Sequence, residues 1–315
     1  MAGTLFCIAV LATLVVSVVL SASLPTDIMQ WTYAFVTPIL FLVVVFVGGR
    51  LDGTDVPRAL GLTRAPRPWQ AGLSIALSVA CIVAFLPLAL GVQLLLGRLG
   101  YHGGPSYADY TSSWGNLVLG LVALALMPAL GEEALCRGMA FGALRQKGTV
   151  YGIFMSALLF GLLHGNPVQL VHQFLIGCVM AYLFHLSGSI WCTVLFHFCN
   201  NAAVIVYDFV YVQAGWSYVL PWWAYLVMCV VGLAVVAGLL CLYARLTLRH
   251  APRREGALVF ADERPTPRMR MQRLLDVNGG YVPYIKGGRA HYAMYVAFAV
   301  VGVLWLVNTI TGWVQ

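Results

Sequence analysis

The sequence predicts an all-α protein, a polytopic transmembrane bundle of about nine helical spans. Of its 315 residues, 61% are hydrophobic and only 9% are charged, whereas an ordinary soluble protein has about 25% charged residues. The mean hydropathy is +0.86. The apolar runs are continuous over about 20 residues, whereas the strands of a β-barrel would alternate over about ten. A soluble globular domain is therefore excluded, and a barrel is disfavoured.

The apolar runs mark the expected spans in order along the chain. They cover residues 4–24, 30–49, 70–97, 117–144, 150–164, 168–186, 189–210, 221–245 and 292–313. The run at 150–164 is the shortest. The first run also has small residues at Ser21, Ala22 and Ser23 that would suit signal-peptide cleavage, but no Lys or Arg precedes it, so a retained helix is the preferred interpretation.

These runs suggest a division of the chain into segments. We predict N-terminal transmembrane helices over 1–114, core helices with intramembrane polar residues over 115–210, an eighth span over 211–245, a basic cytoplasmic loop over 246–291 and a C-terminal span over 292–315. The loop is rich in Arg, Pro and Gly. Such a composition predicts little fixed structure beyond a short helix around Met269–Leu275.

The basic residues predict the orientation of the bundle. The formal net charge is +7, and with the amino terminus in the cytoplasm every Lys and Arg except Arg98 and Arg137 falls on the cytoplasmic side, as the positive-inside rule requires. Ten crowd the stretch at 245–289: Arg245, Arg249, Arg253, Arg254, Arg264, Arg268, Arg270, Arg273, Lys286 and Arg289. This position beside a span suits anionic lipid headgroups rather than nucleic acid. We expect a multi-pass protein of a bacterial or archaeal cell membrane.

Few ionisable residues remain inside the spans, and each calls for a partner or a function because its insertion costs about 2.5 kcal/mol or more. The fourth span contains Glu132, Glu133 and Arg137, the fifth ends at His164, and the seventh contains His197 and Asn201. The sixth span contains two further histidines, which we interpret as interhelical hydrogen-bond partners: His172 and His185.

Helical spacing sorts these polar residues, because residues four apart share a face while adjacent residues diverge by about 100°. Glu133 can therefore pair with Arg137. This pairing leaves Glu132 as a solitary carboxyl in an apolar setting, which suits a general base or acid. A rise of about 1.5 Å per residue places Glu132, His164 and His197 roughly 20, 21 and 12 Å from the cytoplasmic helix ends, so helix tilt allows them to share one membrane layer.

Three motifs at these positions resemble those of the CAAX protease and bacteriocin-processing family of intramembrane endopeptidases, and are similar to those of the type II CAAX prenyl endopeptidases. They are EExxxR at Glu132, Glu133 and Arg137, FxxxH at Phe160 and His164, and HxxxN at His197 and Asn201. The resemblance covers about residues 115–205. The ninth span and the basic loop lie outside it.

The resemblance implies a reaction as well as a fold. It implies that Glu132 and His164 activate water for attack on a peptide carbonyl, and that His197 and Asn201 stabilise the developing oxyanion. Supporting roles fall to Glu133, Arg137 and Phe160. The expected substrate is a membrane-anchored peptide or protein, and three kinds stay open: a prenylated substrate, a bacteriocin leader or a host regulator.

Other interpretations of the same residues stay open. His164, His197 and Glu132 could bind Zn²⁺ with an open coordination position, although the HExxH spacing of helical zinc proteases is absent and no cofactor is favoured. A transporter could use the same groups as a proton relay. A non-hydrolysing binding or immunity protein of the same fold is a third interpretation.

Overall fold

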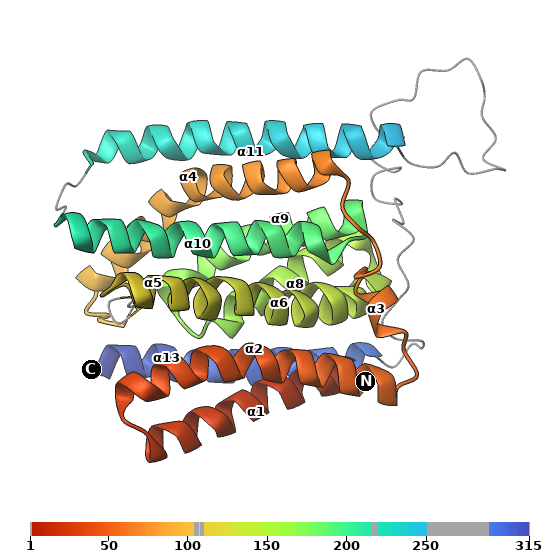
Figure 1. The fold of residues 1–315 in the computed structure, drawn as a ribbon, viewed down its shortest axis with the longest axis horizontal. Helices are drawn as coiled ribbons and strands as arrows, with labels where there is room; N and C mark the ends of the chain where they lie inside the picture. Colours follow the sequence, from red (N-terminus) through yellow and green to blue (C-terminus); the bar gives the residue numbers. More distant parts are fainter. Residues whose placement is uncertain (1, 104–106, 108–109, 216–219, 251–289, 315) are drawn as a thin grey trace.

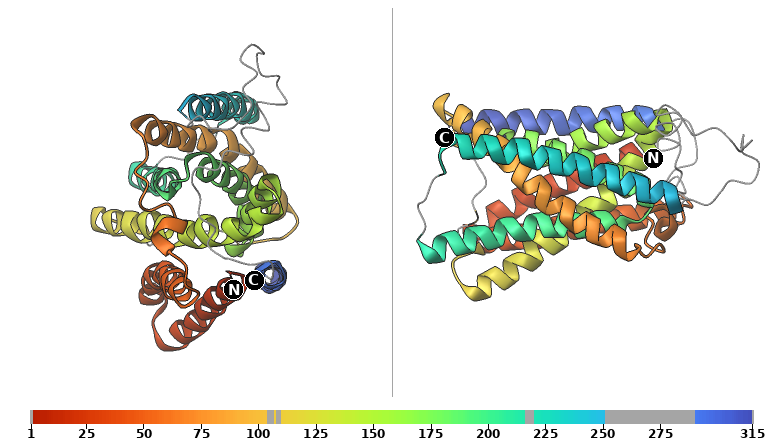
Figure 2. Two further views of the ribbon diagram at one scale, coloured as in Figure 1. Left: turned by 90° about the vertical axis from the view of Figure 1, so that its right-hand side faces the viewer. Right: turned by 90° about the horizontal axis from the view of Figure 1, so that it is seen from above.

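The computed structural model describes residues 2–103, 107, 110–215, 220–250 and 290–314, which form helices and their connections without any strand. Eight helices in this part of the chain are long and apolar enough to cross a membrane. Their axes are roughly aligned, and α1 and α2 run in opposite directions, as the views in Figures 1 and 2 show. The chain is therefore a polytopic helical membrane protein, and the predicted fold class is confirmed.

The helix bounds follow the apolar runs of the sequence closely. The spans are α1 (Ala2–Ser23), α2 (Thr26–Leu51), α4 (Pro68–Arg98), a composite helix (Trp114–Lys147), α9 (Pro167–Ser187), α10 (Ile190–Ala214), α11 (Trp222–His250) and α13 (Ala290–Val314). Helix α8 (Thr149–Leu163) has 15 residues, about 22 Å of rise, and is shorter than the hydrocarbon core of about 30 Å. A short helix, α3 (Val56–Ala59), precedes α4.

The composite helix changes its winding along its length. It consists of α5 (Trp114–Gly120), the π-helical η2 (Leu121–Leu126), α6 (Met127–Glu133), the π-helical η3 (Ala134–Phe141), α7 (Gly142–Leu144) and a 3₁₀ turn, η4 (Arg145–Lys147). A π-helical turn is wider than an α-helical turn and is frequently found at functional sites. Here π-helical turns lie on both sides of the short α6 segment that contains Glu132 and Glu133.

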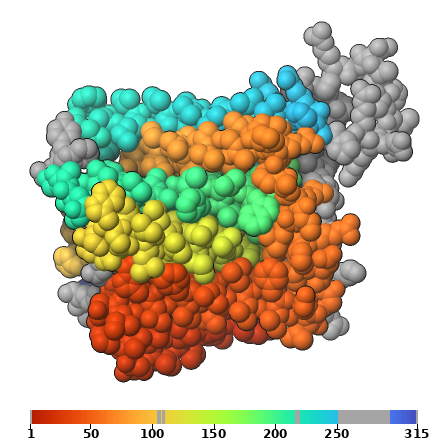
Figure 3. Space-filling model, in the orientation of Figure 1, coloured from red at the N-terminus to blue at the C-terminus, as the bar shows by residue number. Residues whose placement is uncertain are grey.

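Close helix crossings hold the composite helix in place. A Cβ built on Gly131 would lie 2.6 Å from the carbonyl oxygen of Pro38 in α2, so only glycine permits this approach. Helices α8 and α9 also pack closely, since a Cβ on Gly177 would lie 3.1 Å from Ala157 Cα. Figure 3 shows α1 and α2, the composite helix, α10, α4 and α11 as successive bands across one face of the bundle.

Helix ends that carry basic residues lie at the same end of the bundle as the N-terminus (Figure 1). Arg50 lies in the last turn of α2, Lys147 in that of the composite helix and Arg249 in that of α11. Arg98 ends α4 at the opposite end. The rest of the predicted basic loop lies outside the described residues, as does the short helix predicted around Met269–Leu275.

Candidate active site

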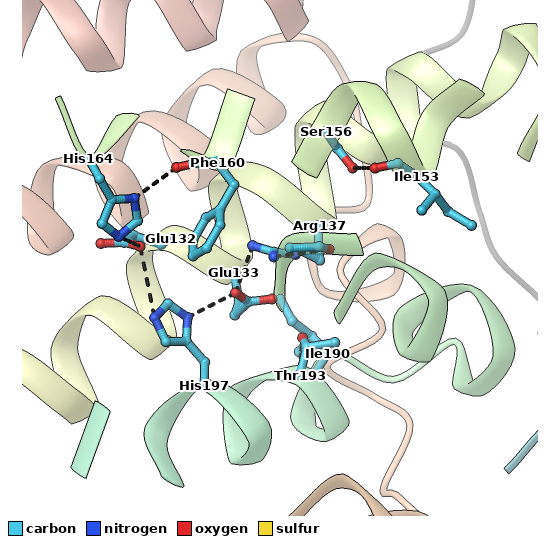
Figure 4. Close-up of polar contacts among 11 residues, drawn as sticks. Glu132, Glu133, Arg137, Ile153, Ser156, Phe160, His164, Ile190, Thr193 and His197 are labelled. Carbon is cyan, nitrogen blue, oxygen red and sulfur yellow. Dashed lines mark hydrogen bonds and ion pairs between the residues drawn. The ribbon is translucent and has the colours of Figure 1, made fainter. Parts of the chain in front are cut away.

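Three helices bring Glu132, His164 and His197 together, as the motifs predict (Figure 4). Glu132 comes from α6, His164 follows the last residue of α8, and His197 lies in the second turn of α10. The Oε2 atom of Glu132 lies 4.0 Å from Nε2 of His164 and 3.9 Å from Nε2 of His197. One carboxylate oxygen thus faces both imidazole rings.

The orientation of His164 is set by its own helix. Its Nδ1 lies 2.8 Å from the carbonyl oxygen of Phe160. A carbonyl only accepts, so Nδ1 carries the proton, and in the neutral ring Nε2 then has a free lone pair. His164 therefore directs a basic nitrogen toward Glu132.

The orientation of His197 is set by Glu133. Its Nδ1 lies 3.0 Å from Oε1 of Glu133, and the same oxygen accepts from Nη1 of Arg137 at 2.9 Å. The predicted pair of Glu133 and Arg137 is therefore present. Arg137 Nη2 also donates to the carbonyl of Gly177 in α9 at 3.5 Å. Glu133, Arg137 and His197 are all at most 2% exposed, so this is a fully buried ionic network.

The ring of Phe160 lies at the centre of the site. Its centroid is 4.9 Å from that of His164 and 5.6 Å from that of His197, both edge to face. The guanidinium carbon of Arg137 lies 4.3 Å from the same centroid, a cation–π contact that is strongest where water is absent. Phe160 thus does more than pack one turn before His164, because it touches both imidazoles and the buried arginine.

Asn201 ties α10 to the π-helical part of the composite helix. Its Nδ2 donates to the carbonyl oxygen of Leu124 in η2 at 3.0 Å. The second N–H of the amide group is not used by this bond. Asn201 is one turn from His197 on the same helix face, as its four-residue spacing predicts.

Exposure divides the site into two layers. The side chains of Glu132 and His164 are 19% and 18% exposed, whereas those of His197 and Glu133 are 2% and 0% exposed. Glu132 and His164 are therefore the more accessible side chains of the site. The buried layer holds these groups in position.

The bond between His197 and Glu133 was not predicted from the sequence. Spacing rules relate residues within one helix, and this contact joins residues 64 positions apart in the chain. The two other histidines of the spans lie in α9. His172 packs edge to face against Phe85 of α4, with centroids 6.5 Å apart, and His185 is buried.

A metal site receives no geometric support from the described part of the chain. No group of three or more His, Cys, Asp or Glu side chains there is arranged to hold a metal ion. Glu132, His164 and His197 are the right residue types for zinc, so the zinc alternative is left to a chelation experiment.

The comparisons with known proteins agree with this site. The model of the family described as "Type II CAAX prenyl endopeptidase Rce1-like" matches residues 114–203, which include all three motifs. A Bacillus subtilis (strain 168) protein described as "Putative membrane peptidase YdiL" is 24% identical over 140 residues, covering 42% of this chain. The match spans 57% of that relative's length. No solved structure matches the chain. Residues 114–203 are thus similar to the Rce1-like type II CAAX prenyl endopeptidases.

Proposed function

We propose that this protein is a CAAX-type intramembrane endopeptidase that hydrolyses a peptide bond of a membrane-anchored substrate without a covalent intermediate. The observation that carries the proposal is the position of Glu132 Oε2, 4.0 and 3.9 Å from the two Nε2 atoms. These distances are too long for direct hydrogen bonds. They suit one water molecule that bridges the three groups.

Glu132 and His164 are suited to accept the proton of that water. Glu132 Oε2 has no hydrogen-bond partner among the described residues, and His164 Nε2 has a free lone pair in the neutral ring. As the water oxygen bonds to the peptide carbonyl carbon, its proton passes to this pair of acceptors. The same proton then goes to the amine nitrogen as the C–N bond breaks, so the step balances without another reactant.

The proposal gives His197 a different role, which the charges around it support. The site contains two carboxylates, Glu132 and Glu133, but only one guanidinium, Arg137. With Glu132, Glu133 and Arg137 charged, a proton on His197 during the reaction would bring the net charge of the cluster to zero. With Nδ1 bonded to Glu133, a protonated His197 would donate from Nε2 to the oxyanion. Asn201 can contribute its second N–H to the same oxygen.

A covalent mechanism has less support in this geometry. In the described structure neither His164 nor His197 bonds to a serine hydroxyl or a cysteine thiol; their partners are the Phe160 carbonyl and the Glu133 carboxylate. Cys136, inside the first motif, is fully buried. A nucleophile needs an adjacent base and access to substrate. Activated water therefore fits the site better.

Glu132→Gln tests this proposal, because the substitution keeps the shape and removes the base. The purified full-length protein is reconstituted in lipid vesicles with a panel of farnesylated CAAX peptides and membrane-anchored leader peptides, and cleavage is followed by mass spectrometry. We expect the wild type to cleave at least one peptide and Glu132→Gln to lose at least about 100-fold in rate. Asp208→Asn is the matched control, because Asp208 lies near the end of α10 and binds Thr111 instead. Equal turnover by the wild type and Glu132→Gln would refute the mechanism.

A further inference from the structure

Helix α13 lies outside the matched residues 114–203 and yet contacts the bundle at three levels. Near its start, a Cβ built on Gly3 of α1 would lie 2.0 Å from the backbone of Ala293. Near its end, the carbonyl of Gly312 accepts from the backbone N–H of His102 at 3.2 Å. Between these two levels lies Asn308, which contacts Gly165. Helix α13 is therefore an integral part of the bundle.

One stripe of α13 faces the bundle, and Asn308 is on it. Met294, Ala297 and Val301 are at most 2% exposed, and Gly312 is buried again at the far end. These positions follow one another at helical spacing, and Asn308 falls between Val301 and Gly312 in the same stripe. Asn308 is nevertheless exposed. Asn308 is thus an exposed position on the side of α13 that faces the bundle.

Asn308 lies beside the residue that follows His164, the histidine at the end of α8. The Nδ2 atom of Asn308 is 2.6 Å from the position of a Cβ built on Gly165, the residue directly after His164. Gly165 has a φ of +62°, so its backbone conformation and this contact both favour glycine. His164 and Glu132 form the more exposed layer of the site. Asn308 therefore lies at the accessible side of the candidate active site.

The side chain of Asn308 has donors and an acceptor that the described residues leave unused. No hydrogen bond or ion pair joins this side chain to another described residue, although its backbone carbonyl accepts from Thr311. One turn earlier, the buried Nε1 of Trp305 also has no hydrogen-bond partner in the described structure. Polar groups inside a membrane protein are costly unless they meet a partner. Two such groups on the inward side of α13 indicate a polar occupant.

We infer that Asn308 is a substrate-binding residue, whose amide binds the peptide backbone of the substrate beside the bond that is cut. An asparagine amide carries a donor and an acceptor on one plane, as the peptide group does, and can pair with the N–H and C=O of an extended chain. The inference rests on the proposed endopeptidase function. It assigns part of substrate recognition to a helix outside the matched region.

The test separates substrate binding from chemistry and from folding. Asn308→Leu and Asn308→Ala are compared with the wild type in vesicles, using the panel peptide that the wild type cleaves fastest. We expect KM to rise about tenfold, as loss of a buried hydrogen bond to substrate would produce, with kcat within about twofold and an unchanged melting temperature. Thr309→Val is the matched control, because that hydroxyl donates to the Trp305 carbonyl of its own helix. It should keep the wild-type KM.

Each other outcome has a definite meaning. An unchanged KM in both Asn308 variants, with normal cleavage by the wild type, would overturn the inference and leave the proposed function intact. A fall in kcat together with the melting temperature in both variants would show a structural role and also overturn it. If the wild type cleaves no peptide of the panel, the proposed function fails and the inference fails with it.

Discussion

Oε1 of Glu133 binds both Nη1 of Arg137 and Nδ1 of His197, at 2.9 and 3.0 Å. A single carboxylate oxygen therefore links the ion pair within one helix to a histidine of another. The second motif glutamate thus has a direct role in orienting the third motif. The EExxxR sequence supplies two carboxylates with separate tasks, since Glu132 faces the accessible side and Glu133 holds His197.

Removing either histidine should abolish most of the activity, but only one removal should weaken the fold. We expect His164→Ala and His197→Ala each to lose at least about 100-fold in kcat/KM. His197→Ala should also lower the free energy of unfolding by about 1–3 kcal/mol, because it leaves the buried Glu133 short of a donor. Among the residues that the structure describes, His164 bonds only to a carbonyl of its own helix. Cleavage assays and thermal unfolding in detergent measure the two effects.

His250→Gln is the control for this pair, because His250 ends α11 and its Nδ1 lies 2.8 Å from the Leu246 carbonyl oxygen of its own helix. It should retain wild-type turnover. If His164→Ala and His197→Ala destabilise the protein equally, the bond between His197 and Glu133 does not contribute as described.

Arg137→Met should destabilise the protein by about 3–5 kcal/mol, because it strands a buried carboxylate. Adding Glu133→Gln should recover much of that loss by removing the charge. The structure adds that the double variant should stay inactive, since His197 then lacks its carboxylate acceptor. Melting temperature and turnover of the single and double variants test the two statements separately. A double variant no more stable than Arg137→Met would show that the pair does not stabilise the fold.

Removal of metal distinguishes the two chemical versions of the site. If Glu132 and His164 activate water without a metal, extended dialysis against EDTA should leave activity intact, with well under one Zn²⁺ per chain by elemental analysis. If the histidines hold a catalytic metal, activity should fall with metal loss and return on addition of Zn²⁺, because an open three-ligand site exchanges its ion. Activity that follows bound metal across a titration would overturn the metal-independent version.

Gly131→Ala should impair catalysis without touching a reacting group. The new Cβ would lie 2.6 Å from the Pro38 carbonyl, so α2 or the α6 segment must shift, at a cost of about 1–3 kcal/mol. Because Glu132 is the next residue, kcat should fall together with the melting temperature. Gly72→Ala in α4 is the control, since its Cβ meets no atom within 4 Å. A Gly131→Ala protein as stable and as active as the control would contradict this crossing.

Hydrophobic runs were enough to predict the spans, because an apolar run of sufficient length leaves a helix as its simplest solution in lipid. The run predicted at 168–186 is observed as Pro167–Ser187. Four-residue spacing likewise predicted the pair of Glu133 and Arg137, since both residues lie on one helix. The π-helical widening of the composite helix was not predictable from the sequence. The π-helical turns of η2 and η3 depend on how neighbouring helices pack, and a 3.6-residue periodicity carries no sign of them.

Contacts between distant helices were the part that the sequence could not supply. Asn201 was predicted to face the site, but its bond to the Leu124 carbonyl depends on the π-helical backbone of η2. The contact of Asn308 with Gly165 joins residues of two segments that no motif connects. A lone asparagine in an apolar run does not by itself predict a functional residue. The position of α13 beside α8 is what places Asn308 near the candidate active site.

The pairing of Glu133 with Arg137 within a single helix also bears on biogenesis. The composite helix precedes α8 and α10 in the chain, so Arg137 is synthesised before His197. Because its partner is one turn away on the same helix, the charge can be neutralised during insertion without waiting for later segments. Glu132 has no such partner on its own helix. Its carboxylate gains its two neighbours, His164 and His197, only when α8 and α10 pack against it. Completion of the catalytic cluster is therefore tied to the insertion of α10, the last of its three helices to be synthesised.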